Sequence, residues 1–132
     1  MIQPVQIQVR FADLDMMGHV NNSVYLSYFE YARVQYFNEI LGKYWDFNKF
    51  GCVVVKNEIN YLKSILLNDT PVVTCFLEEI GSKSFTIGYE MKVNDVIVTT
   101  GRTVLVCFDI QSQKAIEVSQ DWKDALDRLE KR

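Results

Sequence analysis

Residues 22–42 read NSVYLSYFEYARVQYFNEILG, and this stretch decides the fold. Its apolar residues recur every three or four positions, which is the spacing of one face of an α-helix. They are Tyr25, Tyr28, Phe29, Ala32, Tyr36, Phe37, Ile40 and Leu41. Asparagine at the start and Gly42 at the end are typical helix-capping residues. We expect one helix of about five turns, and its wide aromatic stripe predicts that it is largely buried.

Both sides of this helix carry the patterns of β-strands. Apolar and polar residues alternate in residues 5–11, which predicts a strand with one buried face. After the helix come four β-rich runs, at residues 52–62, 72–80, 85–93 and 96–108. The two-residue turn Asn94-Asp95 makes the last two runs a hairpin. A short amphipathic helix is expected at about residues 119–129.

This order of elements predicts an α+β architecture. The later connections are too short for parallel crossovers, so the strands should pair antiparallel. We expect a single domain over residues 1–132, in which a curved five-stranded antiparallel sheet wraps a long central helix and a short C-terminal helix follows. Val53, Val54 and Val55 place apolar side chains on both faces of their strand, which favours oligomerisation.

The composition excludes several classes of partner and cofactor. The chain has 14 Lys and Arg against 17 Asp and Glu, with no basic stripe, so neither nucleic acid nor a membrane is expected as a partner. No apolar run has the length of a membrane span and no signal peptide is evident, so we expect a soluble, cytoplasmic protein. Cys52, Cys75 and Cys107 are widely spaced and form no CxxC pair, which favours reduced thiols over a disulfide framework or a metal site. Neither a metal nor another cofactor is expected.

Residues 10–22, RFADLDMMGHVNN, hold the densest group of polar side chains and lead directly into the helix. The start of a helix offers unpaired backbone N–H groups, which can polarise a carbonyl oxygen. A carboxylate a few residues upstream can activate water or attack the same carbonyl itself. Because a thiol leaves as thiolate without a general acid, a lone carboxylate suits a thioester better than an amide. With one histidine and no Ser-His-Asp set, the sequence predicts thioester hydrolysis.

Residues 10–33, RFADLDMMGHVNNSVYLSYFEYAR, resemble the signature of the hotdog-fold thioesterases of the 4-hydroxybenzoyl-CoA thioesterase type, which include short bacterial acyl-CoA thioesterases. The resemblance implies the hotdog fold over essentially the whole chain. It also implies a homodimer or homotetramer with active sites between subunits, and an acyl-CoA or acyl-carrier-protein substrate. By motif position, it implies that Asp15 is the catalytic carboxylate, as base or nucleophile, and that the backbone N–H of Asn22 binds the thioester carbonyl.

The neighbouring motif residues have more than one role open to them. Asp13 is either the acid instead of Asp15 or a turn carboxylate paired with Arg10. His19 is either a general acid or base, or a positioning residue, and Gly18 and Asn21 are expected to support the loop. The stretch is also similar to plant acyl-carrier-protein thioesterases. However, Met17 stands where those enzymes carry an asparagine and Ile65 where they carry a cysteine, so their histidine-centred catalytic set is incomplete here.

Two further charged residues lie outside this loop. Glu30 is roughly 12 Å along the helix from Asn22, too far to share its carbonyl site. It is expected to be a structural or interface carboxylate that is paired locally, for example with Arg33. Lys63 lies in a segment similar to the family's Tyr-Leu-Lys-Pro, with Ser64 in place of proline. It is either a contact for CoA phosphates or a solvated surface lysine. The resemblance favours an acyl-CoA thioesterase, with an acyl-carrier-protein thioesterase or a non-catalytic acyl-thioester-binding module as alternatives.

Overall fold

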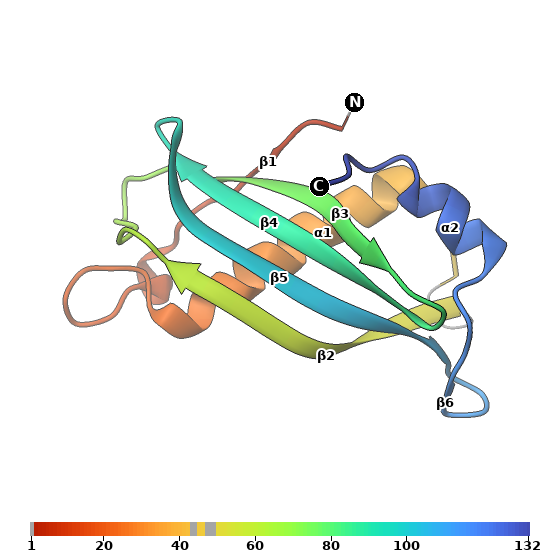
Figure 1. Ribbon diagram of the computed structural model, residues 1–132. Coiled ribbons are helices and arrows are strands. Elements are labelled where there is room, and N and C mark those ends of the chain that lie inside the picture. The colour runs from red at the N-terminus through yellow and green to blue at the C-terminus, as the bar shows by residue number, and fades with distance from the viewer. Residues whose placement is uncertain (1, 43–44, 47–49) are drawn as a thin grey trace.

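A computed structural model of the protein describes residues 2–42, 45–46 and 50–132. One long helix lies against a curved antiparallel sheet, and a short helix lies near the C-terminus (Figure 1). The helical elements are η1 (Phe11–Asp13), η2 (Asn22–Val24), α1 (Tyr25–Leu41) and α2 (Gln120–Leu126). The strands are β1 (Val5–Gln6), β2 (Phe50–Tyr61), β3 (Val72–Ile80), β4 (Ser84–Val93), β5 (Val96–Asp109) and β6 (Lys114–Ala115).

The sheet has the strand order β1-β3-β4-β5-β2, with β6 paired to β5 outside this path. All of these pairs are antiparallel, as expected from the short connections. Asn94 and Asp95 have φ values of 51° and 63°, the left-handed backbone of the tightest hairpin turns, which confirms the predicted hairpin. β2 lies at one edge of the sheet, where β5 is its partner.

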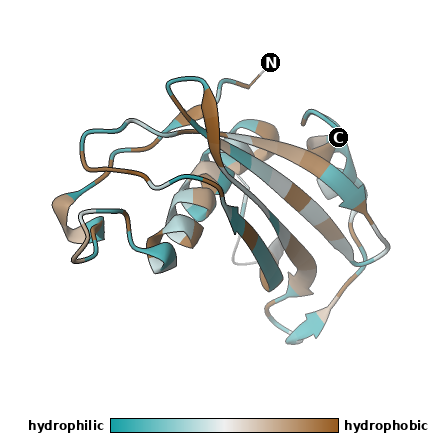
Figure 2. Ribbon diagram, turned by 60° about the vertical axis from the view of Figure 1, so that its left-hand side comes forward, coloured by the Kyte–Doolittle hydropathy of each residue, from teal (hydrophilic) through white to brown (hydrophobic). Residues whose placement is uncertain are grey.

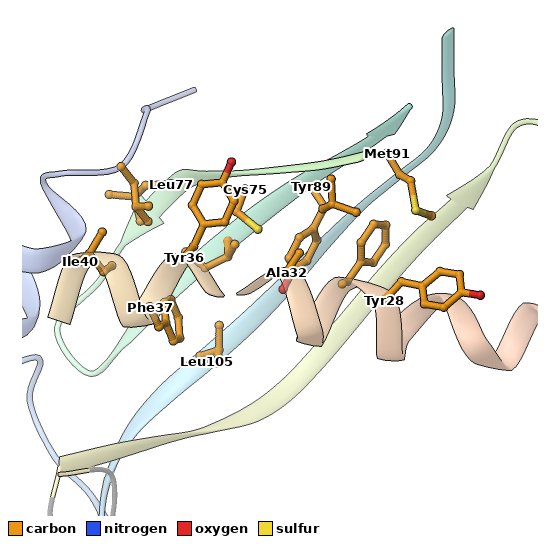
Figure 3. Packing of buried hydrophobic residues seen from close by; sticks show 14 of the residues in the cluster. Tyr28, Ala32, Tyr36, Phe37, Ile40, Cys75, Leu77, Tyr89, Met91 and Leu105 are labelled. Carbon is orange, nitrogen blue, oxygen red and sulfur yellow. The ribbon is translucent and has the colours of Figure 1, made fainter. Parts of the chain in front are cut away.

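The core lies between α1 and the inner face of the sheet. Figure 3 shows Tyr28, Tyr36 and Ile40 of the helix packed with side chains of the strands such as Leu77 and Met91. Hydrophobic and hydrophilic residues are interspersed along the strands (Figure 2). In β4 they alternate, and its apolar residues Phe85, Ile87, Tyr89 and Met91 are buried, as on a strand with one face toward the core. The predicted fold is confirmed: a long helix, a curved five-stranded antiparallel sheet and a short C-terminal helix.

Side chains of helix and sheet are packed tightly near Gly101. The ring of Phe29 stacks on that of Tyr89 with centroids 4.4 Å apart. A Cβ atom at Gly101 would lie 2.7 Å from Phe29 Cε2 and 2.9 Å from the carbonyl oxygen of Glu58. Glycine is therefore required at this position for α1 to pack against β5 at the observed distance.

Two details of the predicted fold are wrong. The first strand ends at Gln6, and Phe11 is 81% exposed, because the backbone turns into η1 where the alternating pattern continues. The helix is only buried on one face, since Leu26, Tyr31 and Val34 are exposed on the other. The short strand β6 has no counterpart among the expected elements.

The edge strand β2 exposes apolar side chains, and the cysteines are free thiols. Val53, Val54 and Val55 are all at least 41% exposed on the edge strand β2. Cys75 and Cys107 are buried, and burial raises the pKa of Cys52 to about 12. In residues 2–42, 45–46 and 50–132, no helix is both long and apolar enough to cross a membrane.

Candidate active site

The loop between η1 and η2 is a tight turn that is docked on the segment after β2. His19 forms an antiparallel bridge with Leu66. The backbone N–H of Asp15 donates to the carbonyl of His19 at 2.7 Å, and that of Gly18 donates to the carbonyl of Asp15 at 3.1 Å. Gly18 has a φ of 79°, which glycine adopts without strain. The backbone of the loop is thus fixed by hydrogen bonds at both ends.

The Asp15 carboxylate is held through one of its two oxygens. Oδ1 accepts hydrogen bonds from the backbone N–H groups of Met17, at 2.9 Å, and His19, at 3.2 Å. Within the described part of the chain, Oδ2 accepts no hydrogen bond, and the side chain is exposed. The turn therefore orients this carboxylate and leaves one oxygen available to water or a ligand.

The start of the helix leaves one backbone donor unused. Oδ1 of Asn21 accepts from the backbone N–H of Ser23 at 3.0 Å, so the expected asparagine cap is confirmed. The carbonyl of Asn21 accepts from the N–H of Val24 at 2.9 Å. No acceptor for the N–H of Asn22 is found among the residues that the structure describes. A free donor at the positive end of a helix is suited to a carbonyl oxygen or an oxyanion.

Asp13 is a buried carboxylate behind this loop. The hydroxyl of Tyr28 donates to its Oδ2 at 2.7 Å, and Arg10 donates from its backbone N–H at 3.0 Å and from Nη2 at 3.2 Å. Burial opposes ionisation of Asp13, but the hydrogen bonds from Tyr28 and Arg10 outweigh it and lower the pKa of the carboxyl. The expected pairing with Arg10 is therefore present, and all the oxygens of Asp13 are occupied.

Two tyrosines that the sequence analysis did not select lie at the same end of the sheet. The hydroxyl of Tyr61, the last residue of β2, donates to the carbonyl of Asn22 at 3.0 Å. Burial raises the pKa of Tyr25; the backbone of Ile65 opposes this rise, and the charges of Tyr61 and Asp15 add to it. The end of β2, the helix start and the Asp15 turn are therefore neighbours. The sequence signal for Tyr61 was its place in the Tyr-Leu-Lys segment.

The remaining predicted residues lie around this group. Lys63 is two positions beyond Tyr61, with an exposed side chain and its backbone N–H donating to Val98 at 3.1 Å. The expected ion pair between Glu30 and Arg33 is wrong: Glu30 is exposed, whereas the buried Arg33 donates to the hydroxyl of Tyr89 at 2.8 Å. The loop and helix start thus bring together Asp15, His19 and Asn22, and leave Glu30 on the open face of α1.

A cleft of about 1000 Å³ opens beside the helix start but does not contain Asp15 or Asn22. It is lined by parts of residues 6–13, 24–31 and 67–70, with the Asp13–Tyr28 pair in its wall. Neither of the two predicted reacting groups is among the residues that line it. In the described ranges, no three His, Cys, Asp or Glu side chains are grouped as metal ligands would be.

The chain is similar to known thioesterases in sequence and in fold. The model of the thioesterase-like superfamily matches residues 9–126. The long-chain acyl-CoA thioesterase FadM of Escherichia coli is 29% identical over 129 residues, which cover 96% of this chain and 98% of that protein. A thioesterase of Thermus thermophilus, crystallised with coenzyme A and zinc, is 32% identical, covers 94% of this chain and 96% of its own, and superposes with a TM-score of 0.81. A hypothetical protein of the same organism superposes with a TM-score of 0.88 at 25% identity, over 97% of this chain and 99% of its own. The chain belongs to the thioesterase-like superfamily.

Proposed function

We propose that this protein is an acyl-CoA thioesterase that hydrolyses an acyl-CoA to a carboxylic acid and CoA. One observation carries the assignment of the site: an exposed carboxylate with a free oxygen, Asp15, lies in the turn that leads to a free helix N–H, that of Asn22. The similarity to FadM and to a thioesterase crystallised with coenzyme A supports CoA as the carrier of the acyl group.

In the proposed reaction, the thioester carbonyl oxygen accepts a hydrogen bond from the N–H of Asn22. The positive end of the helix stabilises the negative charge that develops on this oxygen. In the general-base route, Asp15 takes a proton from water as the water oxygen bonds to the carbonyl carbon. The carbon–sulfur bond then breaks, and the leaving thiolate takes the proton from Asp15. In the alternative route, Asp15 attacks the carbonyl carbon itself, and the carbon–sulfur bond breaks to expel the CoA thiolate. Water then hydrolyses the resulting anhydride to the free acid and the Asp15 carboxyl, whose proton passes to the thiolate.

A second copy of the chain is part of this proposal. The free edge of β2 and the exposed Val53, Val54 and Val55 are suited to pairing with another β2. Asp15 is exposed at the surface of the single chain, where a partner subunit could complete the site. We therefore infer a homodimer, or a homotetramer built from it. Cytoplasmic location is proposed on the basis of the three free cysteines.

The direct test is a thiol-release assay with purified protein and a panel of short-, medium- and long-chain acyl-CoAs and one aromatic acyl-CoA. Release of free CoA above the rate of spontaneous hydrolysis supports the proposal, and the panel ranks the substrates. The same acyl groups on acyl carrier protein are assayed beside them. Turnover of the carrier-protein esters alone would replace CoA by acyl carrier protein. No turnover of either set by a folded oligomer would favour a non-catalytic binding protein.

A further inference from the structure

We propose that Tyr61 is a positioning residue, which holds the N–H of Asn22 in the orientation needed to bind the thioester carbonyl. This inference rests on the proposed function, because it assigns Asn22 the role of carbonyl donor. It starts from one contact: the hydroxyl of Tyr61 donates to the carbonyl oxygen of Asn22 at 3.0 Å. The two residues are 39 positions apart, on the edge strand of the sheet and at the start of the helix.

The ring of Tyr61 has a rigid support. It packs edge-to-face on the ring of Tyr25, with centroids 4.9 Å apart and planes at 80°. Tyr25 is 2% exposed and belongs to the core cluster. At the end of β2, the backbone of Tyr61 is paired with Thr99 of β5. The hydroxyl therefore reaches Asn22 from a fixed point of the sheet, since an aromatic side chain has only two torsions to order.

The hydrogen bond from Tyr61 completes a set of contacts around Asn22. On its N-terminal side, the carbonyl of Asn21 accepts from the N–H of Val24. In the peptide that follows, the N–H of Ser23 donates to the Asn21 side chain. On its C-terminal side, the carbonyl of Asn22 accepts from Tyr61. Both peptide groups that flank the Cα of Asn22 are thus fixed. The N–H of Asn22 lies in the first of these planes. The hydrogen bond from Tyr61 holds the second, so rotations at the Cα of Asn22 that would tilt the donor are restricted.

This arrangement matters because the first turn of a helix frays easily. A donor to a developing oxyanion is effective when its direction is fixed before the reaction, and misalignment lowers the rate more than the affinity. Tyr61, on the edge strand, restrains this turn from outside the helix. Removing the hydroxyl of Tyr61 should therefore lower kcat and leave KM nearly unchanged.

The test compares Tyr61→Phe, which keeps the ring and removes the hydroxyl, with Tyr31→Phe as a matched control. Tyr31 lies on the open face of α1, and its hydroxyl makes no hydrogen bond with the part of the chain that the structure describes. For Tyr61→Phe we expect kcat to fall about tenfold on the best acyl-CoA, with KM within about twofold and an unchanged melting temperature. Tyr31→Phe should match the wild type. An unchanged kcat in Tyr61→Phe, or a raised KM at unchanged kcat, would overturn the proposal.

A second measurement separates this proposal from the proposed function. The order parameter of the Asn22 N–H, from ¹⁵N relaxation, should be near the rigid value of about 0.85 in the wild type. It should be lower in Tyr61→Phe and unchanged in Tyr31→Phe. If the wild type hydrolyses no thioester, the proposed function fails, and with it the role of Tyr61 in catalysis. If the wild type is active but the order parameter is the same in all three proteins, only the positioning role is overturned.

Discussion

The hydroxyl of Tyr28 donates a 2.7 Å hydrogen bond to Oδ2 of Asp13, and both residues line the cleft beside the helix start. Asp13 is two residues before Asp15, and its carbonyl accepts from the backbone N–H of Asn21 at 2.8 Å. The buried hydrogen bond therefore connects the loop to the beginning of α1. In this way the predicted carboxylate and the predicted carbonyl donor are held in one rigid unit.

Tyr28→Phe should destabilise the protein by about 2 kcal/mol at pH 7, the typical contribution of a hydrogen bond to a charged group. Because the folded pKa of Asp13 is lowered from 3.8, its contribution to stability is present above pH 3.8 and is lost as the pH falls through the lower, folded value. The variant raises that folded pKa, so its unfolding free energy should fall less steeply below about pH 4. Denaturant titrations at a series of pH values measure both effects. Equal slopes for the variant, the wild type and the control Tyr31→Phe would remove Asp13 as the cause.

Gly101→Ala should destabilise the protein by about 1–3 kcal/mol, the usual cost of adding a methyl group to a packed core. The new Cβ meets the ring of Phe29 and the backbone of β2, and the backbone contact leaves no room to adjust. Gly81→Ala is the control, because the nearest atom to its Cβ is the movable hydroxyl of Ser84, at 3.3 Å. Thermal unfolding of both variants is the measurement. Equal melting temperatures would contradict the close approach of helix and sheet.

Val54→Lys should dissociate the proposed dimer, because a lysine on an edge strand opposes pairing with another strand. Val96→Lys provides a control, since Val96 is similarly exposed but begins β5 at the hairpin turn. Sedimentation velocity of the three proteins gives the mass in solution. We expect a monomer only for Val54→Lys, together with loss of thioesterase activity. A stable dimer of Val54→Lys would place the subunit interface elsewhere.

Much of the fold could be predicted because its elements have clear periodicity. Helix α1 and strand β4 each have a regularly spaced apolar set that is buried, and the turn at Asn94 needs a backbone that few residues adopt. The exposure of Phe11 could not be predicted, since alternation does not show where a strand stops pairing. The sequence also could not show that one face of α1 is exposed. Leu26 and Val34 on that face are apolar, as core residues are, yet no other part of the described chain covers them.

The candidate site, too, could be predicted only in part. Asp15 and Asn22 are close in sequence, and a local motif was enough to select them. The contact of Tyr61 with Asn22 and that of Tyr28 with Asp13 join residues 39 and 15 positions apart. Such contacts depend on how the helix packs against the sheet, and a local sequence pattern does not contain that information. The sequence therefore indicates only a core position for Tyr28 and no role for Tyr61, although the hydroxyl of each makes a hydrogen bond to the loop or the helix start.

The most direct test of the proposed mechanism is the rate of thiol release by Asp15→Asn under saturating substrate. Replacing the carboxylate by an amide keeps the size of the side chain but removes the base or nucleophile, so kcat should fall at least about a hundredfold. Glu30→Gln, a matched change on the open face of α1, should retain the wild-type kcat. A near-wild-type rate in folded Asp15→Asn, or a selective loss of turnover in Glu30→Gln, would show that the catalytic carboxylate is not Asp15.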